Sequence, residues 1–209
     1  MLDRSVFDRW ANDYNEEVRI ADENDEYPFA GYTKIMNHIY NAIQKQPTSN
    51  VLDVGVGTGT LAKALYENGH NITAIDFSSE MLAVARRKMP DAVFYQHDFS
   101  VGLPSDIVGA KYDFIISTYA LHHLPDEQKS AFIKSLLPYL SDNGVVFIGD
   151  IGFPTRKAFN ECHEKNAADW DDDEYYFVFE ELVDSMQNDC RITYEQMSHC
   201  AGLLKIQAQ

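Results

Sequence analysis

Short apolar runs alternate with amphipathic stretches through the middle of the chain. Several of these runs have the length of a β-strand and are apolar at successive positions, which is typical of parallel strands covered on both faces. They are Asn50–Val54, Asn71–Asp76, Ala92–His97, Tyr112–Ser117 and Gly144–Asp150. The stretches between them show helical spacing of their apolar residues. This rhythm predicts an α/β fold, namely a Rossmann-like, doubly wound, mostly parallel sheet with helices on both faces.

Capping and breaking residues mark the predicted helices. The helix over Thr60–Asn68 ends at Gly69, and the helix over Ser78–Met89 begins with a serine cap and stops at Pro90. Pro125 opens a third helix whose first turn carries two acidic residues, where the helix dipole favours negative charge.

The pattern changes on both sides of this core. Residues 1–46 predict two helices without a strand, and residues 155–189 predict an acidic helical insertion. We expect both segments to form a helical cover over the sheet, because 209 residues suit one sizeable domain. Residues 1–209 are therefore predicted to form a single domain around an α/β core in residues 50–150.

A glycine-rich loop follows the first predicted strand. The segment from Val51 to Gly59 reads Val-Leu-Asp-Val-Gly-Val-Gly-Thr-Gly, and the next helix begins at Thr60. Glycines let the backbone approach a ligand closely, and a helix N-terminus presents unpaired N–H groups. Strand, glycine loop and helix in this order form the nucleotide site of open α/β sheets.

The glycine spacing and the nearby acidic residues distinguish this loop from a dinucleotide-binding loop. The dinucleotide fingerprint needs its third glycine one place later, where Thr60 stands. Asp53 would oppose a pyrophosphate but can hold an ammonium group, so the ligand is expected to have a cationic amino-acid end. Asp76 and Asp98 end the next two strands and are predicted to face the same crevice. Asp76 would accept from ribose hydroxyls and Asp98 from an adenine amine, with a helix cap as the alternative role of Asp76.

The charge balance argues against nucleic acid as a partner. The chain has 33 acidic and 17 basic residues, a formal net charge of −16, and no basic stripe. Such a field repels a phosphate polymer. The acidic cluster in residues 169–174 is predicted to be a solvated face, and attraction of a basic substrate is its alternative role.

Cysteine usage and the N-terminal sequence predict a cytoplasmic protein. Cys162, Cys190 and Cys200 show no C-x-x-C spacing, which favours free thiols in a reducing compartment. The first ten residues lack the apolar segment of a signal peptide, and no apolar run is long enough to span a membrane. The oligomeric state stays open.

The middle of the chain resembles the class I S-adenosylmethionine-dependent methyltransferases. The resemblance runs from about Asn50 to Asp150 and is carried by Leu52–Gly59, Ile75–Ser78, Met81-Leu82, His97–Phe99 and Ser117–Leu124. The glycine loop, Ser117–Leu124 and Asp171–Tyr176 are most similar to the YrrT-like methyltransferases of Gram-positive bacteria. The resemblance implies methyl transfer from S-adenosylmethionine to a small-molecule acceptor, with S-adenosylhomocysteine as product. It makes residues 50–150 the cofactor-binding core.

The resemblance also assigns cofactor contacts by position. Gly55 and Gly57 would line the methionine part, Asp76 would bind the ribose, and Asp98 and Phe99 would flank the adenine. An N-terminal tyrosine closes over the cofactor in similar enzymes. The implied cofactor-binding residues are Tyr14, Asp53, Gly55, Gly57, Thr58, Gly59, Asp76, Phe77, Met81, Asp98, Phe99, Ser117 and Tyr119.

His122 and His123 are the predicted catalytic residues. They follow the fourth strand, and histidine titrates near neutrality, as a general base for an acceptor proton must. The alternative is a structural loop histidine bonded to a neighbouring carbonyl. No metal is expected, because metal-dependent members of the wider family have carboxylates at the ends of strands four and five. Here strand four ends in Ser117-Thr118, although Asp150 ends strand five.

Two other functions share the loop and the acidic residues. A nicotinamide-dependent oxidoreductase would use a similar site, although the glycine spacing and Asp53 argue against it. A non-catalytic sensor could bind S-adenosylmethionine without turnover.

The C-terminus departs from the family pattern. Related sheets finish with an antiparallel hairpin of two strands, whereas Gly202 introduces one candidate strand here, Leu203–Ala208. We therefore expect a sheet that lacks one strand of this hairpin.

Overall fold

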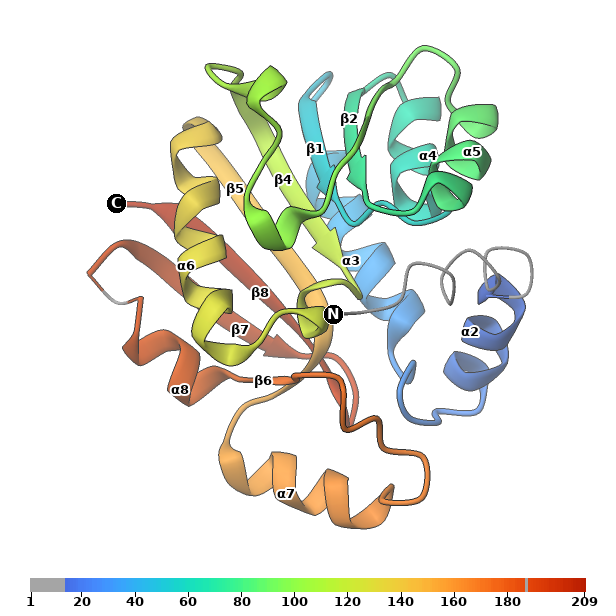
Figure 1. The fold of residues 1–209 in the computed structure, drawn as a ribbon, viewed down its shortest axis with the longest axis vertical. Helices are drawn as coiled ribbons and strands as arrows, with labels where there is room; N and C mark the ends of the chain where they lie inside the picture. Colours follow the sequence, from blue (N-terminus) through green and yellow to red (C-terminus); the bar gives the residue numbers. More distant parts are fainter. Residues whose placement is uncertain (1–13, 187) are drawn as a thin grey trace.

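A sheet with the strand order β3-β2-β1-β4-β5-β8-β7 runs through the centre of the molecule (Figure 1). The computed structural model describes residues 14–186 and 188–209. Parallel neighbours make up most of the sheet: β1 (Asn50–Val54), β2 (Asn71–Asp76), β3 (Val93–Gln96), β4 (Tyr112–Thr118) and β5 (Leu140–Phe153). The predicted α/β fold with a mostly parallel sheet is confirmed.

The sheet ends in a complete antiparallel hairpin, so the expectation of a missing strand is wrong. β8 (Ala201–Ala208) runs antiparallel to β5, and β7 (Cys190–Gln196) pairs with β8. On β7 Cys190 is buried while Arg191 and Glu195 are exposed. A strand that buries one face has a weaker apolar signal than a strand covered on both faces. The hydrophobic pattern therefore missed β7.

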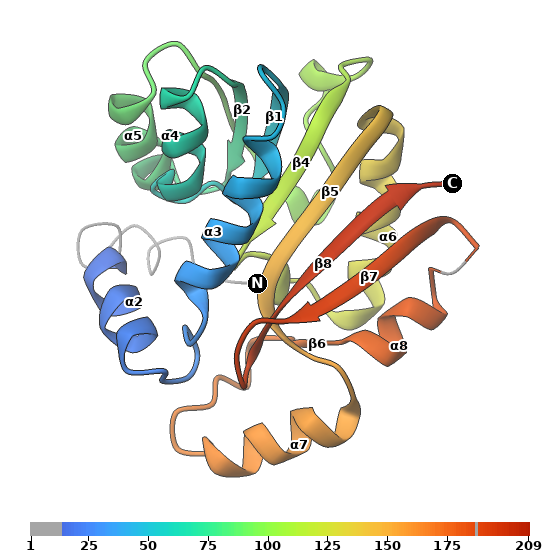
Figure 2. The same cartoon turned by 180° about the vertical axis from the view of Figure 1, so that it is seen from behind.

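Alternate residues of the strands point into two separate cores. One core lies under α3 (Tyr32–Ile43), α4 (Thr60–Glu67) and α5 (Ser79–Lys88), and the other under α6 (Asp126–Leu136) and α8 (Phe179–Asp184). Figures 1 and 2 show these two layers from opposite sides. On β1, Val51 packs into the first core and Leu52 into the second, as the twofold period of a strand requires.

Local signals set the helices much as the sequence predicts. The Oγ atom of Ser78 accepts the N–H of Met81 at 3.2 Å and caps α5. In α3, Ile35, Ile39 and Ile43 share one face and are fully buried, and each contributes about 1.5–3 kcal/mol by burial. Short 3₁₀ turns connect several elements, over Phe99–Val101, Ser105–Ile107, Leu121–His123 and Leu137–Tyr139. The thiols of Cys162, Cys190 and Cys200 are free and buried.

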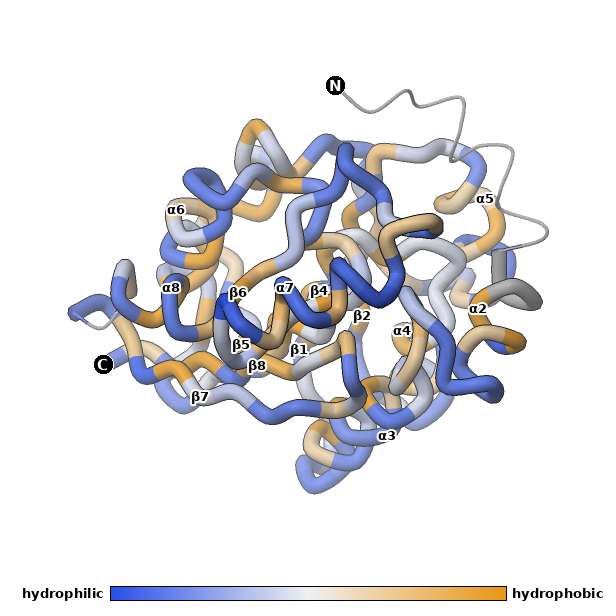
Figure 3. The backbone as a smooth tube through the Cα atoms, turned by 90° about the horizontal axis from the view of Figure 1, so that it is seen from below, coloured by the Kyte–Doolittle hydropathy of each residue, from blue (hydrophilic) through white to orange (hydrophobic). Residues whose placement is uncertain are grey.

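The segments outside the core gather at the carboxyl ends of the parallel strands. α2 (Tyr14–Glu23) and α7 (Arg156–Lys165) lie beyond the ends of β4 and β5 in Figure 1. β6 (Phe177–Val178) brings the chain back from α7 and pairs with the end of β5. Figure 3 shows α7 as largely hydrophilic, as expected for a surface element. Among the helices in the described ranges, none combines the length and the apolar composition needed to cross a membrane.

Candidate active site

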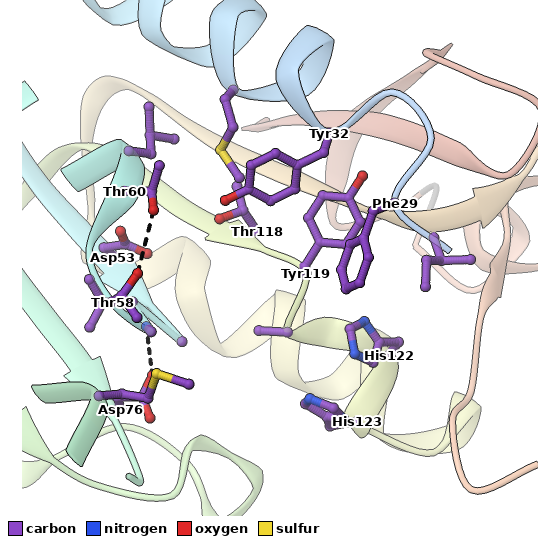
Figure 4. Close-up of a pocket in the computed structure, with 18 of the residues that line it drawn as sticks. Phe29, Tyr32, Asp53, Thr58, Thr60, Asp76, Thr118, Tyr119, His122 and His123 are labelled. Carbon is purple, nitrogen blue, oxygen red and sulfur yellow. Dashed lines mark hydrogen bonds between the residues drawn. The ribbon is translucent and has the colours of Figure 1, made fainter. Parts of the chain in front are cut away.

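A pocket lies at the carboxyl ends of the central strands, where three segments meet (Figure 4). Its walls come from the glycine loop, from the chain between α2 and α3, and from the insertion after β5. It holds about 1040 Å³ of empty space, its open mouth included.

The glycine loop shapes one wall of the pocket. Gly55 has a φ of 80°, and a Cβ at this position would lie 2.5 Å from the Cβ of Ala120. Gly57 has a φ of 54° and faces open space. Glycine adopts such angles without a steric penalty, so the loop exposes its backbone to a ligand. Thr58 also lines the pocket, whereas Gly59 lies at the start of α4 against α5.

Asp76 fixes this loop from the end of β2. Its Oδ2 accepts the N–H of Gly57 at 2.7 Å, and its Oδ1 accepts the N–H of Ser78 at 2.9 Å. The side chain that caps α5 is Ser78, so the cap considered as the alternative role of Asp76 belongs to its neighbour. Asp76 is a pocket-lining carboxylate whose direction is set by two backbone donors.

Asp53 is the second carboxyl group on this wall. It is buried, and its Oδ1 has no hydrogen-bond partner among the described residues. Burial, together with the nearby charge of Asp76, raises the pKa of Asp53 to about 8. A buried carboxyl group that faces a pocket with one oxygen unmatched is suited to a cationic ligand, which would lower its pKa and complete its hydrogen bonds.

The remaining predicted cofactor residues divide into two groups. Those that line the pocket are Phe77, Met81, Phe99 and Tyr119. Asp98 is exposed, and its carboxylate accepts the N–H of Ser100 at 2.9 Å at the start of a 3₁₀ turn. Ser117 is buried and donates to the carbonyl of Val54 at 2.9 Å. The side chains of Asp98 and Ser117 therefore support the backbone around the pocket and do not line it.

An aromatic cluster forms the opposite wall. The ring of Tyr119 lies 5.5 Å from that of Phe29 and 5.1 Å from that of Tyr32, measured between centroids. Tyr119 has a φ of 50°, an uncommon angle for a residue other than glycine. Figure 4 shows the three rings gathered above the two histidines. Tyr14 is the first residue of α2, and its side chain lies outside the described part of the structure.

A polar end of the pocket, defined by His122, His123, Asp150 and Glu174, lies beside the aromatic wall. Asp150 is fully buried at the end of β5, and its Oδ1 lies 2.6 Å from Nδ1 of His122. The other ring nitrogen, Nε2, faces Oε1 of Glu174 at 3.4 Å. Glu174 in turn accepts a hydrogen bond from the hydroxyl of Tyr176 at 2.8 Å. A continuous polar chain thus joins the end of β5 to the insertion.

The two histidines have opposite electrostatic surroundings. Burial lowers the pKa of His122, but attraction and a hydrogen bond from Asp150, with attraction from Glu174, raise it overall. Burial and the neighbouring His122 lower the pKa of His123 to about 2. A general base works best with a pKa near the operating pH. The two histidines are therefore better suited to binding a ligand than to acting as a general base. In the ligand-free protein their surroundings favour the protonated form of His122 and the neutral form of His123.

The chain matches known methyltransferases across this region. A family model described as a methyltransferase domain matches residues 51–144. An uncharacterized methyltransferase of Oceanobacillus iheyensis is 35% identical over 153 residues, which cover 73% of this chain and 68% of the relative. The chain belongs to the class I S-adenosylmethionine-dependent methyltransferases. S-adenosylmethionine is therefore the cofactor of this methyltransferase, as the sequence predicts.

Solved methyltransferase structures share the fold over nearly the whole chain. DhpI in complex with S-adenosylhomocysteine superimposes with a TM-score of 0.72 at 20% identity, covering 98% of this chain and 94% of DhpI. Magnesium protoporphyrin IX methyltransferase from Synechocystis, also with bound S-adenosylhomocysteine, gives 0.70 at 18% identity, covering 99% and 100%. At these identities the likeness establishes the fold.

The pocket-lining residues that sequence reasoning did not assign to the site include Phe29 and Glu174. Phe29 lies in the connection between α2 and α3, and Glu174 lies in the acidic cluster that was expected to be a solvated face. The available signal for Glu174 was the resemblance of Asp171–Tyr176 to the YrrT-like methyltransferases. No periodicity pointed to Phe29.

Proposed function

We propose that this methyltransferase acts on a small molecule bound between the glycine loop and the polar end of the pocket. The observation that carries the proposal is the juxtaposition of a cofactor wall, with Asp53 and Asp76, and a separate polar end, with His122 and Glu174, in one pocket. Aromatic side chains form the wall opposite the glycine loop. Such a pocket offers one surface to a cofactor and a different surface to an acceptor.

The residues of the cofactor wall fit S-adenosylmethionine. The unmatched carboxyl of Asp53 would hold the ammonium group, and Asp76 would bind the ribose. Gly55 and Gly57 would line the methionine part, since neither residue has a side chain that would cover the backbone. The apolar side chains for the adenine are Phe77, Met81 and Phe99. When bound, the cofactor supplies a methyl group on a sulfonium that is already a good leaving group.

The chain mainly has to align the acceptor and exclude water. Alignment of this kind can supply about 7–11 kcal/mol of the barrier. The faces of Tyr32 and Tyr119 form an aromatic wall that suits a cationic group. His122 and His123 are proposed as the catalytic residues in the sense that they contact the acceptor at the polar end.

The residues that line the pocket also narrow the chemical class of the acceptor. Among the described residues that line the pocket, none is lysine or arginine. A small molecule without a strongly anionic group is therefore the best match, and the neighbour named for magnesium protoporphyrin IX also acts on a small molecule. We further propose that the chain belongs to the YrrT-like subgroup, supported by the glycine loop, Ser117–Leu124 and Asp171–Tyr176.

Calorimetric titration with S-adenosylhomocysteine, with NADH as the control ligand, tests the cofactor site. We expect micromolar binding of the first and none of the second. A panel of neutral and amine acceptors, followed by mass spectrometry for methylated product, tests the acceptor class. Binding of S-adenosylhomocysteine with no product from any small acceptor would count against the proposal and favour a sensor.

A further inference from the structure

We propose that His122, His123 and Glu174 bind a divalent transition-metal ion at the polar end of the pocket, with zinc as the best chemical match. Each residue offers one ligand atom, and the three atoms all lie within 4.8 Å of one another. Two imidazoles and one carboxylate are a ligand set that zinc accepts in catalytic sites. All three side chains line the same pocket.

The spacing of His122 and Glu174 already matches two ligands of one ion. Ligand atoms about 2.0–2.1 Å from a tetrahedral ion lie about 3.3 Å apart. The observed distance from Nε2 of His122 to Oε1 of Glu174 is 3.4 Å. The ring of His123 lies 4.1 Å from that of His122, and the three ligand atoms lie within 4.8 Å of one another, so His123 would have to move closer to complete the set.

Outer partners orient two of the proposed ligands. Asp150 accepts from Nδ1 of His122 at 2.6 Å, and the backbone N–H groups of His122 and Ile151 donate to the same carboxylate at 3.1 and 2.8 Å. This arrangement directs the lone pair of Nε2 toward Glu174. The hydroxyl of Tyr176 donates to the second oxygen of Glu174 at 2.8 Å. A carboxylate behind a ligating histidine is the usual outer shell of zinc sites.

The proposed metal ion would bind the acceptor and would not be a structural ion that stabilises the fold. Three protein ligands would leave the fourth position of a tetrahedral ion open, as in catalytic zinc sites, and all three ligands line the pocket. His122 would lose its extra proton to solvent when the ion binds, and two neutral imidazoles with one carboxylate would leave the ion with a net positive charge. This role rests on the proposed function: the ion would bind an acceptor hydroxyl or thiol and release its proton to solvent. The acceptor lone pair would then form the bond to the methyl carbon as the methyl–sulfur bond breaks, its electrons staying on sulfur.

The inference departs from the sequence expectation of no metal. That expectation considered carboxylates at the ends of strands four and five only. In the proposed site the carboxylate ligand is Glu174, which lies in the insertion. Asp150 is the hydrogen-bond partner of His122 and is not itself a proposed ligand.

Titration of the EDTA-treated, dialysed protein with zinc chloride tests the site. Calorimetry gives stoichiometry and affinity, and a parallel titration with cobalt chloride reports tetrahedral coordination by its visible absorption. We expect one ion per chain, and binding at least tenfold weaker in Glu174→Gln. Asp172→Asn is the matched control, because Asp172 is an exposed acidic residue of the same insertion and should leave zinc binding unchanged.

The outcomes separate this proposal from the proposed function. Absence of zinc binding in the wild-type chain, wild-type affinity in Glu174→Gln, or an equal loss in Asp172→Asn would overturn the metal site. If Glu174→Gln fails to fold, His123→Gln carries the same expectation. Titration of the same samples with S-adenosylhomocysteine reports the cofactor wall independently. Zinc binding without S-adenosylhomocysteine binding would support the ion site and count against the proposed function.

Discussion

The two halves of the pocket are assembled in different ways. The cofactor half is local, since Asp53, Gly55 and Gly57 lie within one strand-to-helix turn and Asp76 ends the adjacent strand. The polar end collects His122 from the turn after β4, Asp150 from the end of β5 and Glu174 from the insertion. Short-range sequence patterns therefore position the residues of the cofactor half. The residues of the polar end come together only when segments distant in the chain pack against one another.

The polar groups of the two halves also differ in how they are satisfied. In the cofactor half a buried carboxyl of Asp53 keeps an oxygen without a partner among the described residues. At the polar end, Asp150, His122, Glu174 and Tyr176 partner one another in series. The cofactor half therefore has a free acceptor atom for a cationic ligand. At the polar end, a ligand must replace existing hydrogen bonds between side chains in order to bind.

Gly55→Ala should give the largest effect and would break the cofactor half alone. The new Cβ would lie 2.5 Å from Ala120, and residue 55 has a φ of 80°. We expect the affinity for S-adenosylhomocysteine to fall on the order of 100-fold, or about 2.7 kcal/mol, as measured by calorimetry.

Gly69→Ala is the matched control for this substitution. Gly69 has a φ of 86°, but open space surrounds its missing Cβ. It should lose about 1–2 kcal/mol of stability with unchanged affinity. Equal loss of affinity in both variants would mean that backbone strain, and not close approach, explains Gly55.

Asp76→Ala should weaken S-adenosylhomocysteine binding at least about tenfold, while circular dichroism shows that the fold survives. Asp76 both lines the pocket and holds the N–H of Gly57. Asp98→Ala should change the affinity by less than about threefold, because Asp98 is exposed and caps a 3₁₀ turn. Equal effects of the two substitutions would contradict this distinction.

Binding of S-adenosylhomocysteine at pH 7 should release close to one proton. With a pKa of about 8, Asp53 is about 0.9 protonated in the ligand-free protein, and a bound ammonium group would ionise it. Calorimetry in buffers of different ionisation enthalpy measures this number. Proton uptake, or no transfer, would show that Asp53 does not face the ammonium group.

Asp53→Asn provides the control and a stability test. The folded-state pKa of Asp53 is raised from 3.8 to about 8. The folded state therefore binds more protons than the unfolded state between these values, and stability falls as pH rises through them. Asp53→Asn removes this dependence, abolishes the proton release, and should raise the melting temperature at pH 8.

Tyr27→Phe should give the smallest effect on ligand affinity, and it tests whether the polar end and the cofactor half act independently. The Tyr27 hydroxyl contacts that of Tyr176, whereas its ring stacks on Trp170 at 5.1 Å. Phenylalanine keeps the stack and loses the hydroxyl, so unfolding should become about 1 kcal/mol easier in denaturant titrations. Affinity for S-adenosylhomocysteine should stay within twofold, and a larger change would show that the two halves are coupled.

Short-range sequence predicted most of the elements that position the cofactor half. The strand ends at Val54 and Asp76, the cap at Ser78 and the turn at Gly55–Gly59 all appear where local pattern placed them. Each depends on periodicity, a cap or a glycine, which act over a few residues. The start of β5 at Leu140 was missed, because the exposed Asp142 and Asn143 interrupt the apolar run.

Tertiary structure alone decided the edge of the sheet and the polar end. β7 has a one-sided pattern that becomes a strand by pairing with β8. Glu174 belongs to a cluster of acidic residues, and only the packing of the insertion against the end of β5 turns it toward His122. Local propensities describe a residue and its near neighbours. A contact between segments distant in the chain depends on the whole fold. The sequence by itself therefore determined the family, the sheet core and the glycine-loop wall of the pocket, and the structure determined which groups meet at its polar end.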